Sequence, residues 1–155
     1  MTHEIERALE AKGITLPKAA APVASYVPAV ELNDILYISG QISMVDGKLI
    51  TGRLGDDMTI EQGQEAAQAC ALMIAAQIKA AVGSLDRVER IVKLGAFVNS
   101  TPEFTDHPKV ANGCSDMMEV IFGEAGIHAR SAVGVAALPL GIAVEVDAIV
   151  ALTNI

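Results

Sequence analysis

The chain contains two β-rich runs that are each followed by one amphipathic helix, and this order constrains the fold more than any other feature. The first helix is predicted over about 60–82, because Thr59 to Gln62 matches a capping box and an apolar stripe follows it. Gly83 is well suited to end that helix, and a second helix is predicted over about 107–122. Together these features predict an α+β fold, in which two main helices cover one face of a mixed sheet.

The β-rich runs carry their own turn signals. Residues 25–32 and 34–45 are rich in β-branched and aromatic side chains, and the Asn33-Asp34 pair between them favours a turn. Asp46-Gly47 is typical of a type I′ hairpin, and residues 88–98 are predicted to form a strand between the two helices. The first part of the chain is therefore predicted to be a β-meander.

The final stretch, 128–150, is predicted to form a hairpin around Leu138-Pro-Leu-Gly141. In the register that this turn implies, Arg130, Glu145 and Asp147 share one face, with small side chains around them. Glu145 would lie opposite Gly134, roughly 13 Å along the strand from Arg130, so no direct ion pair is expected. We find no role for Asp147 in the sequence alone.

Each polar position of this region has two interpretations. Arg130 is either a solvated or neutralised strand end or a guanidinium that binds a substrate carboxylate, and Glu145 is either solvent-facing or a general acid and base. Ser39-Gly40-Gln41 marks either a β-bulge or a close approach of the backbone to a ligand or subunit. Tyr26 is most simply a core or interface residue on the first strand.

Composition narrows the class of protein. The 155 residues fit one domain, which we divide into a short N-terminal helix and linker (1–20) and the main body (21–155). A net charge of −8 and only 3% aromatic residues argue against nucleic-acid binding. Cys70, Cys114 and the scattered histidines form no metal-ligand pattern, and no phosphate-binding loop is present, so we expect neither a metal nor a cofactor.

The compartment and the assembly follow from similar arguments. The first residues lack the apolar core of a signal peptide, and no apolar run is long enough to span a membrane, which predicts a cytoplasmic protein without membrane contact. If both helices cover one face of the sheet, its other face leaves apolar side chains uncovered. Such a surface predicts a homo-oligomer.

Several segments together resemble the RidA/YjgF family of reactive-intermediate deaminases, which is often labelled the L-PSP endoribonuclease family. They are YVPAV, LYISGQI, DGKL, the Gln-Glu-Ala-Ala helix, RIVKLGAFVNS, ARSAVGVAALPLG and VEVDAIV. The likeness covers nearly everything after residue 20, and its most specific part runs from Ala129-Arg130-Ser131 to Val144-Glu145-Val146-Asp147. It implies a chorismate-mutase-like fold and a homotrimer with a central β-barrel and three inter-subunit clefts.

The resemblance also implies a reaction and its residues. Arg130 would bind the carboxylate of a 2-aminoacrylate-type enamine or its imine tautomer, and water would then release ammonia and leave a 2-oxo acid. Glu145 would orient or activate that water, while Gly40 and Tyr26 would line the cleft. Ser39 and Ala132 complete the predicted substrate-binding residues, and no metal or organic cofactor takes part.

Three departures point to a divergent subfamily. Ala132 stands where the archetypal deaminases have cysteine, residues 100–118 differ from the archetype, and the helix over 3–12 is extra. An alternative is therefore that the chain forms a non-catalytic trimer, which binds small carboxylates or has a regulatory role. An endoribonuclease is the weakest alternative, because the chain is acidic, poor in aromatic residues and without a His/Lys general-base pair.

Overall fold

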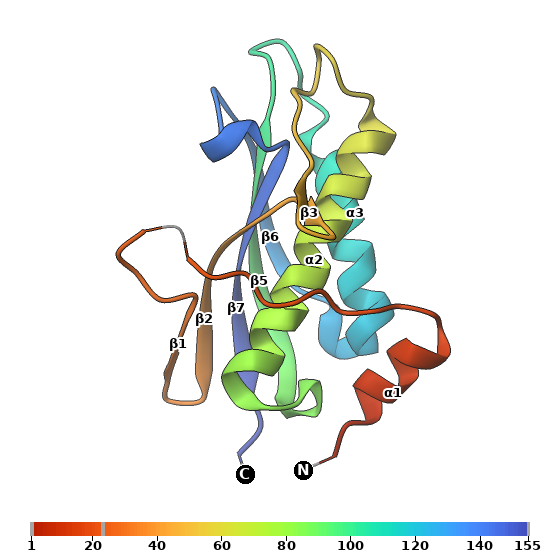
Figure 1. Cartoon of the computed structure of the whole chain (residues 1–155), viewed down its shortest axis with the longest axis vertical. Coiled ribbons are helices and arrows are strands. Elements are labelled where there is room, and N and C mark those ends of the chain that lie inside the picture. Colours follow the sequence, from red (N-terminus) through yellow and green to blue (C-terminus); the bar gives the residue numbers. More distant parts are fainter. Residues whose placement is uncertain (1, 23, 155) are drawn as a thin grey trace.

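The structure, a computed structural model, describes residues 2–22 and 24–154 and is built around one five-stranded sheet (Figure 1). Its spatial order is β1 (Ala29–Leu32), β2 (Ile35–Ile42), β7 (Val144–Leu152), β5 (Val88–Asn99) and β6 (Ala129–Val135). Neighbouring strands are antiparallel except β5 and β6, which are parallel. The sheet is therefore mixed, as the sequence predicts.

The helices α2 (Ile60–Val82) and α3 (His107–Phe122) cover one face of this sheet (Figure 1). Along β7 the residues from Val144 to Leu152 alternate between buried and half-buried, so every second side chain packs beneath the helices. The two helices pack so closely that a Cβ at Gly113 of α3 would collide with the main chain of Gln64 in α2. The core is consequently made mostly of small and aliphatic side chains.

Both helices begin and end where the sequence predicts. The capping box is present, since the Thr59 side chain accepts from the Gln62 N–H at 3.1 Å and the Gln62 side chain accepts from the Thr59 N–H at 2.9 Å. Gly83 ends α2 with φ of 91°, a backbone conformation that glycine adopts without strain. The predicted bounds of α3 and the strand over 88–98 are also confirmed.

The predicted meander is only partly correct. The Asn33-Asp34 and Asp46-Gly47 turns form, with positive φ at all four residues. However, the strand predicted over 34–45 ends at Ile42, and β3 (Met44–Val45) pairs with β4 (Lys48–Leu49) in a separate two-stranded sheet. The first strand begins at Ala29 rather than Ser25, so Tyr26 lies in a bend before it.

The predicted C-terminal hairpin is wrong. Although β6 and β7 follow each other in sequence, β5 lies between them in the sheet. The chain passes from β5 through α3 to β6, and a helical crossover of this length returns the next strand parallel to the first. Both edges of β7 are then occupied, by β2 and by β5, so β6 has no edge of β7 with which to pair.

The new register also separates the three charged residues that were predicted to share a face. Arg130 is aligned with Leu94, which is fully buried beneath the helices. Glu145 is aligned with Phe97 and Asp147 with Gly95, on the opposite face. Side chains of aligned residues point to the same side of a sheet, so Arg130 lies on the helix side while both carboxylates lie on the open side.

The open face carries exposed apolar side chains, as the sequence predicts. Tyr37 and Val133, on β2 and β6, each retain 47% of their accessible surface. At one end of the sheet, the short helix α1 (Glu4–Ala11) packs beside the 3₁₀ helix η1 (Leu85–Arg87), where Leu9 is buried and Glu6 accepts from the Leu85 N–H at 2.9 Å. None of the helices within the described residues is both long and apolar enough to traverse a bilayer.

Candidate functional site

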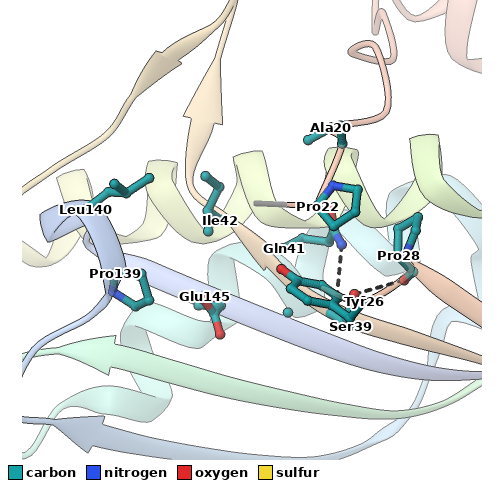
Figure 2. A pocket seen from close by; sticks show the side chains of 12 residues that line it. Ala20, Pro22, Tyr26, Pro28, Ser39, Gln41, Ile42, Pro139, Leu140 and Glu145 are labelled. Atoms are coloured by element: carbon teal, nitrogen blue, oxygen red, sulfur yellow. Dashed lines mark hydrogen bonds between the residues drawn. The ribbon is translucent and has the colours of Figure 1, made fainter. Parts of the chain in front are cut away.

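A small cleft of about 90 Å³ lies beside the second half of β2, beyond the point where β1 stops pairing with it. Figure 2 shows the side chains of Tyr26, Gln41 and Glu145 around this cleft, together with Pro139 and Leu140 from the 3₁₀ helix η3 (Pro139–Gly141). Residues 20–22 of the N-terminal linker close one side. The cleft therefore combines an apolar lining with one carboxylate, a composition suited to a small organic ligand.

A β-bulge at Ser39-Gly40 shapes the floor of the cleft. The register between β2 and β7 shifts between Ile38 and Gln41, which confirms the bulge interpretation of this stretch. Gly40 also accommodates the Glu145 side chain, since a Cβ at this position would lie 2.5 Å from Glu145 Oε2 and 2.8 Å from its Cδ. The glycine thus fixes where the carboxylate can sit, while Ser39 Oγ donates to the Pro28 carbonyl at 3.0 Å.

A buried chain of amides supports the bulge from behind. Gln77 of α2, 2% exposed, donates to the Ala20 carbonyl at 2.7 Å and to Gln41 Oε1 at 3.2 Å. Gln41, 5% exposed, donates in turn to the Ser39 carbonyl at 2.9 Å. The sequence did not predict this supporting role for either glutamine, although a glutamine within the apolar stripe of a helix is a signal for such a network.

The carboxyl groups on this side of the sheet bind protons more tightly than usual. Burial raises the pKa of Glu145, and the nearby charge of Asp147 raises it further. Burial also raises the pKa of Asp147, against the opposing effects of the Gly95 N–H and the Lys93 ammonium. A raised pKa makes the ionised carboxylate a stronger base, so Glu145 is suited to accept a proton from water and return it.

Arg130 lies away from this cleft, against α3. Its Nη1 donates to Asn112 Oδ1 at 2.9 Å and to Ser115 Oγ at 3.1 Å, and its Nη2 donates to the Pro108 carbonyl at 3.4 Å. Within residues 2–22 and 24–154 no carboxylate forms an ion pair with Arg130. The guanidinium is thus oriented by neutral acceptors and keeps its charge available for an anion.

His128, which was not among the predicted site residues, orients the Ser115 hydroxyl that accepts from Arg130. His128 Nδ1 lies 2.6 Å from the Gly126 carbonyl, which can only accept, so Nδ1 carries a proton. In the neutral ring Nε2 is then an acceptor for Ser115 Oγ at 2.9 Å, which leaves the Ser115 lone pairs for Arg130. The spacing of Asn112, Ser115 and His128 gave no motif that could have revealed this.

The predicted site residues therefore form two separate groups within one chain. Tyr26, Ser39, Gly40 and Glu145 meet at the cleft, whereas Arg130 and Ala132 lie on β6. Glu145 and Arg130 are two strand spacings and three residues apart, which gives a Cα separation of about 14 Å, and they point to opposite faces. A single small ligand cannot contact both side chains of one chain.

Comparisons with known proteins provide the context for this geometry. A family model described as "YjgF/chorismate_mutase-like, putative endoribonuclease" matches residues 6–151. Protein TCP17 of Trypanosoma cruzi is 54% identical over 148 residues, covering 94% of this chain and 92% of that protein. A 2-iminobutanoate/2-iminopropanoate deaminase of Dermatophagoides farinae is 33% identical over 139 residues, covering 88% and 93%. The solved structure of Atu1372 from Agrobacterium tumefaciens, a protein with unknown function, is 45% identical, has a TM-score of 0.89, and covers 96% of this chain and 92% of that one.

Proposed function

This chain belongs to the YjgF/chorismate-mutase-like family, and we propose that it hydrolyses small imines of 2-oxo acids, of the 2-aminoacrylate type, to the 2-oxo acid and ammonia. Membership of the family confirms the resemblance found in the sequence and its chorismate-mutase-like α+β fold. One observation supports the activity most directly: the half-buried Glu145, with its raised pKa, lies in a small cleft beside Gly40 and Tyr26. A relative named as an imine deaminase supports the same conclusion.

We further propose that the complete site forms between copies of the chain in a homotrimer. Arg130 lies on β6, an edge strand of the sheet, and the cleft lies beside β2 near the other edge. An edge strand of one copy can reach the cleft of its neighbour, which would bring Arg130 and Glu145 of different copies to one ligand. Packing the open sheet faces into a central barrel would also cover the exposed Tyr37 and Val133.

In this arrangement each side chain has a defined task. The Arg130 fork binds the carboxylate of the imine through two parallel hydrogen bonds, and its orientation by Asn112 and Ser115 lowers the entropy lost on binding. Glu145 accepts a proton from water as the water oxygen bonds to the imine carbon. The same carboxyl group passes this proton to nitrogen, which gives a carbinolamine. It then moves the proton of the new hydroxyl group to nitrogen as the carbon–oxygen double bond forms and the carbon–nitrogen bond breaks, so that ammonia leaves with a 2-oxo acid.

The proposed activity is tested by following 2-iminopropanoate, generated enzymatically, in the presence of wild-type protein, Arg130→Ala and Arg90→Ala. Arg90 is a matched control because it is an exposed strand arginine that belongs to neither group of site residues, and its Nε donates to the Ile127 carbonyl. We expect wild type and Arg90→Ala to accelerate loss of the imine over the rate without protein. Arg130→Ala should give no acceleration. No acceleration by the wild type, with saturable binding of a 2-oxo acid, would instead favour the non-catalytic carboxylate-binding trimer.

A further inference from the structure

A second and larger hollow, of about 290 Å³, lies at the end of the sheet where two loops meet. In Figure 1 these loops, residues 52–58 and 100–106, lie at the top of the molecule. They are joined by main-chain hydrogen bonds, since the Leu54 N–H donates to the Asn99 carbonyl at 2.9 Å and the Thr101 N–H donates to the Leu54 carbonyl at 3.0 Å. None of the residues that line this hollow lines the cleft around Glu145.

The hollow contains a cation that lacks a partner. Arg53 lines it, and among the described residues the buried Nε of Arg53 has no hydrogen-bond partner. Within residues 2–22 and 24–154, no carboxylate lies within ion-pair distance of the Arg53 guanidinium, although the chain has 19 acidic and 11 basic residues. Asp57 contacts the main chain of Arg53 and not its guanidinium, since Asp57 Oδ1 accepts from the Arg53 main-chain N–H at 2.7 Å. A buried donor without a partner is unfavourable, so a bound anion would stabilise it.

A histidine and a serine that are hydrogen-bonded to each other provide one further donor on the opposite wall. His107 Nε2 lies 3.1 Å from Ser100 Oγ, and the Phe104 ring packs edge-on against the imidazole at 5.3 Å. Gly134 of β6 makes room for this pair, because a Cβ there would touch both His107 Nε2 and Ser100 Oγ. His107 is also the first residue of α3, where the helix dipole favours negative charge.

The same pair could serve as a nucleophile and its base, but its surroundings are unsuited to that chemistry. No carboxylate within the described residues hydrogen-bonds His107, and Asp106 pairs with Lys109 at 3.7 Å. The adjacent amides cannot stabilise an oxyanion, because the N–H groups of Ser100 and Thr101 donate to main-chain carbonyls. The geometry is therefore that of a binding site rather than of an acyl-transfer site.

We propose that this hollow binds a small organic anion with a short apolar chain. Its carboxylate or phosphate group lies between Arg53 and the His107–Ser100 pair, where the Arg53 guanidinium and the Ser100 hydroxyl can both donate to it while His107 Nε2 donates to Ser100 Oγ. Its apolar chain packs against the other wall, which is formed by Pro102, Phe104, Val135 and Ala136. Gly134 is four residues from Arg130 along β6, so their Cα atoms lie about 13 Å apart. The Arg130 guanidinium nevertheless reaches the Pro108 carbonyl, next to His107, so the two sites are neighbours, and Arg130 is not among the residues that line this hollow.

The test is a titration of protein carrying ¹⁵N-labelled histidine with butanoate and, separately, with inorganic phosphate, followed by the imidazole resonances. We expect a saturable shift of the His107 signals with butanoate, with little change at His3. The shift should persist in Arg130→Ala, which removes the proposed substrate anchor beside Pro108. Arg53→Gln is expected to weaken binding at least about tenfold, the usual effect of removing a charged hydrogen-bond donor, while Arg90→Gln leaves it unchanged. Ser100→Ala is a second variant in case Arg53→Gln does not fold.

Three results would overturn the proposal. They are the absence of a saturable shift in the wild type, equal affinity in wild type and both site variants, and a response to phosphate without one to butanoate. The imine assay reads a different site, so failure of this titration leaves the proposed deaminase activity standing, and failure of that assay leaves this site standing.

Discussion

Gly40→Ala isolates the position of the Glu145 carboxyl group from the stability of the fold. An added Cβ would lie 2.5 Å from Oε2, 2.8 Å from Cδ and 2.9 Å from Cγ of Glu145. Ordinary carbon contacts are about 3.5–4.0 Å, so the carboxyl group must move by about 1 Å. The backbone at Gly40 does not have a positive φ, and therefore alanine introduces no conformational strain there.

The expected magnitudes differ for stability and for activity. The displaced atoms form the end of a flexible, half-buried side chain, so we expect the free energy of unfolding to fall by about 1 kcal/mol or less, the low end for overpacking. A displacement of about 1 Å at a catalytic group lowers kcat by roughly 100-fold. The variant should thus fold normally and hydrolyse 2-iminopropanoate slowly.

The assay compares kcat for wild type, Gly40→Ala, Glu145→Gln and the double variant, with urea unfolding as the check on stability. If Gly40→Ala acts through Glu145, the double variant should be no slower than Glu145→Gln alone. Multiplicative losses in the double variant, or a Gly40→Ala protein with wild-type kcat, would refute the role given to the glycine.

Three further predictions concern the buried polar groups. Because the pKa values of Glu145 and Asp147 are raised, the folded state binds more protons than the unfolded state at pH values above the ordinary pKa of a carboxyl group. The free energy of unfolding should therefore fall as pH rises through and above that range. Glu145→Gln should weaken this pH dependence, measured by urea unfolding at several pH values. Burial raises the pKa of Cys114 to about 12 and that of Cys70 well above its usual value, so a disulfide reagent should modify both only as fast as the protein opens. Gln77→Leu leaves a buried acceptor and a partly buried one without their donor, and should lower the free energy of unfolding by about 1–3 kcal/mol in chemical denaturation.

Local patterns predicted the helices and turns well because their causes are local. The capping box at Thr59 and the positive φ at Asp46 and Gly47 depend on a few neighbouring residues, and all are present. The grouping of Gly40 with Glu145 came instead from the family resemblance, because a contact between β2 and β7 leaves no trace in local spacing.

The pairing of β6 could not be predicted in this way. Leu138 to Gly141 resembles a tight connection, yet whether β6 joins β7 depends on which strands occupy the edges of β7. This global competition aligned Arg130 with Leu94 and so put its side chain on the opposite face from Glu145 and Asp147. The partners of Arg130 on α3, Asn112 and Ser115, were hidden for the same reason.

We propose that one catalytic site takes Arg130 from one copy of the chain and Glu145 from another. The most direct measurement mixes Arg130→Ala and Glu145→Ala chains, each inactive alone, unfolds and refolds them together, and measures hydrolysis of 2-iminopropanoate. In a cyclic trimer with one site per interface, random mixing of equal amounts restores both groups at about one quarter of the sites, so about a quarter of wild-type activity is predicted. A refolded mixture that contains mixed trimers and is no more active than either variant alone would contradict the shared site.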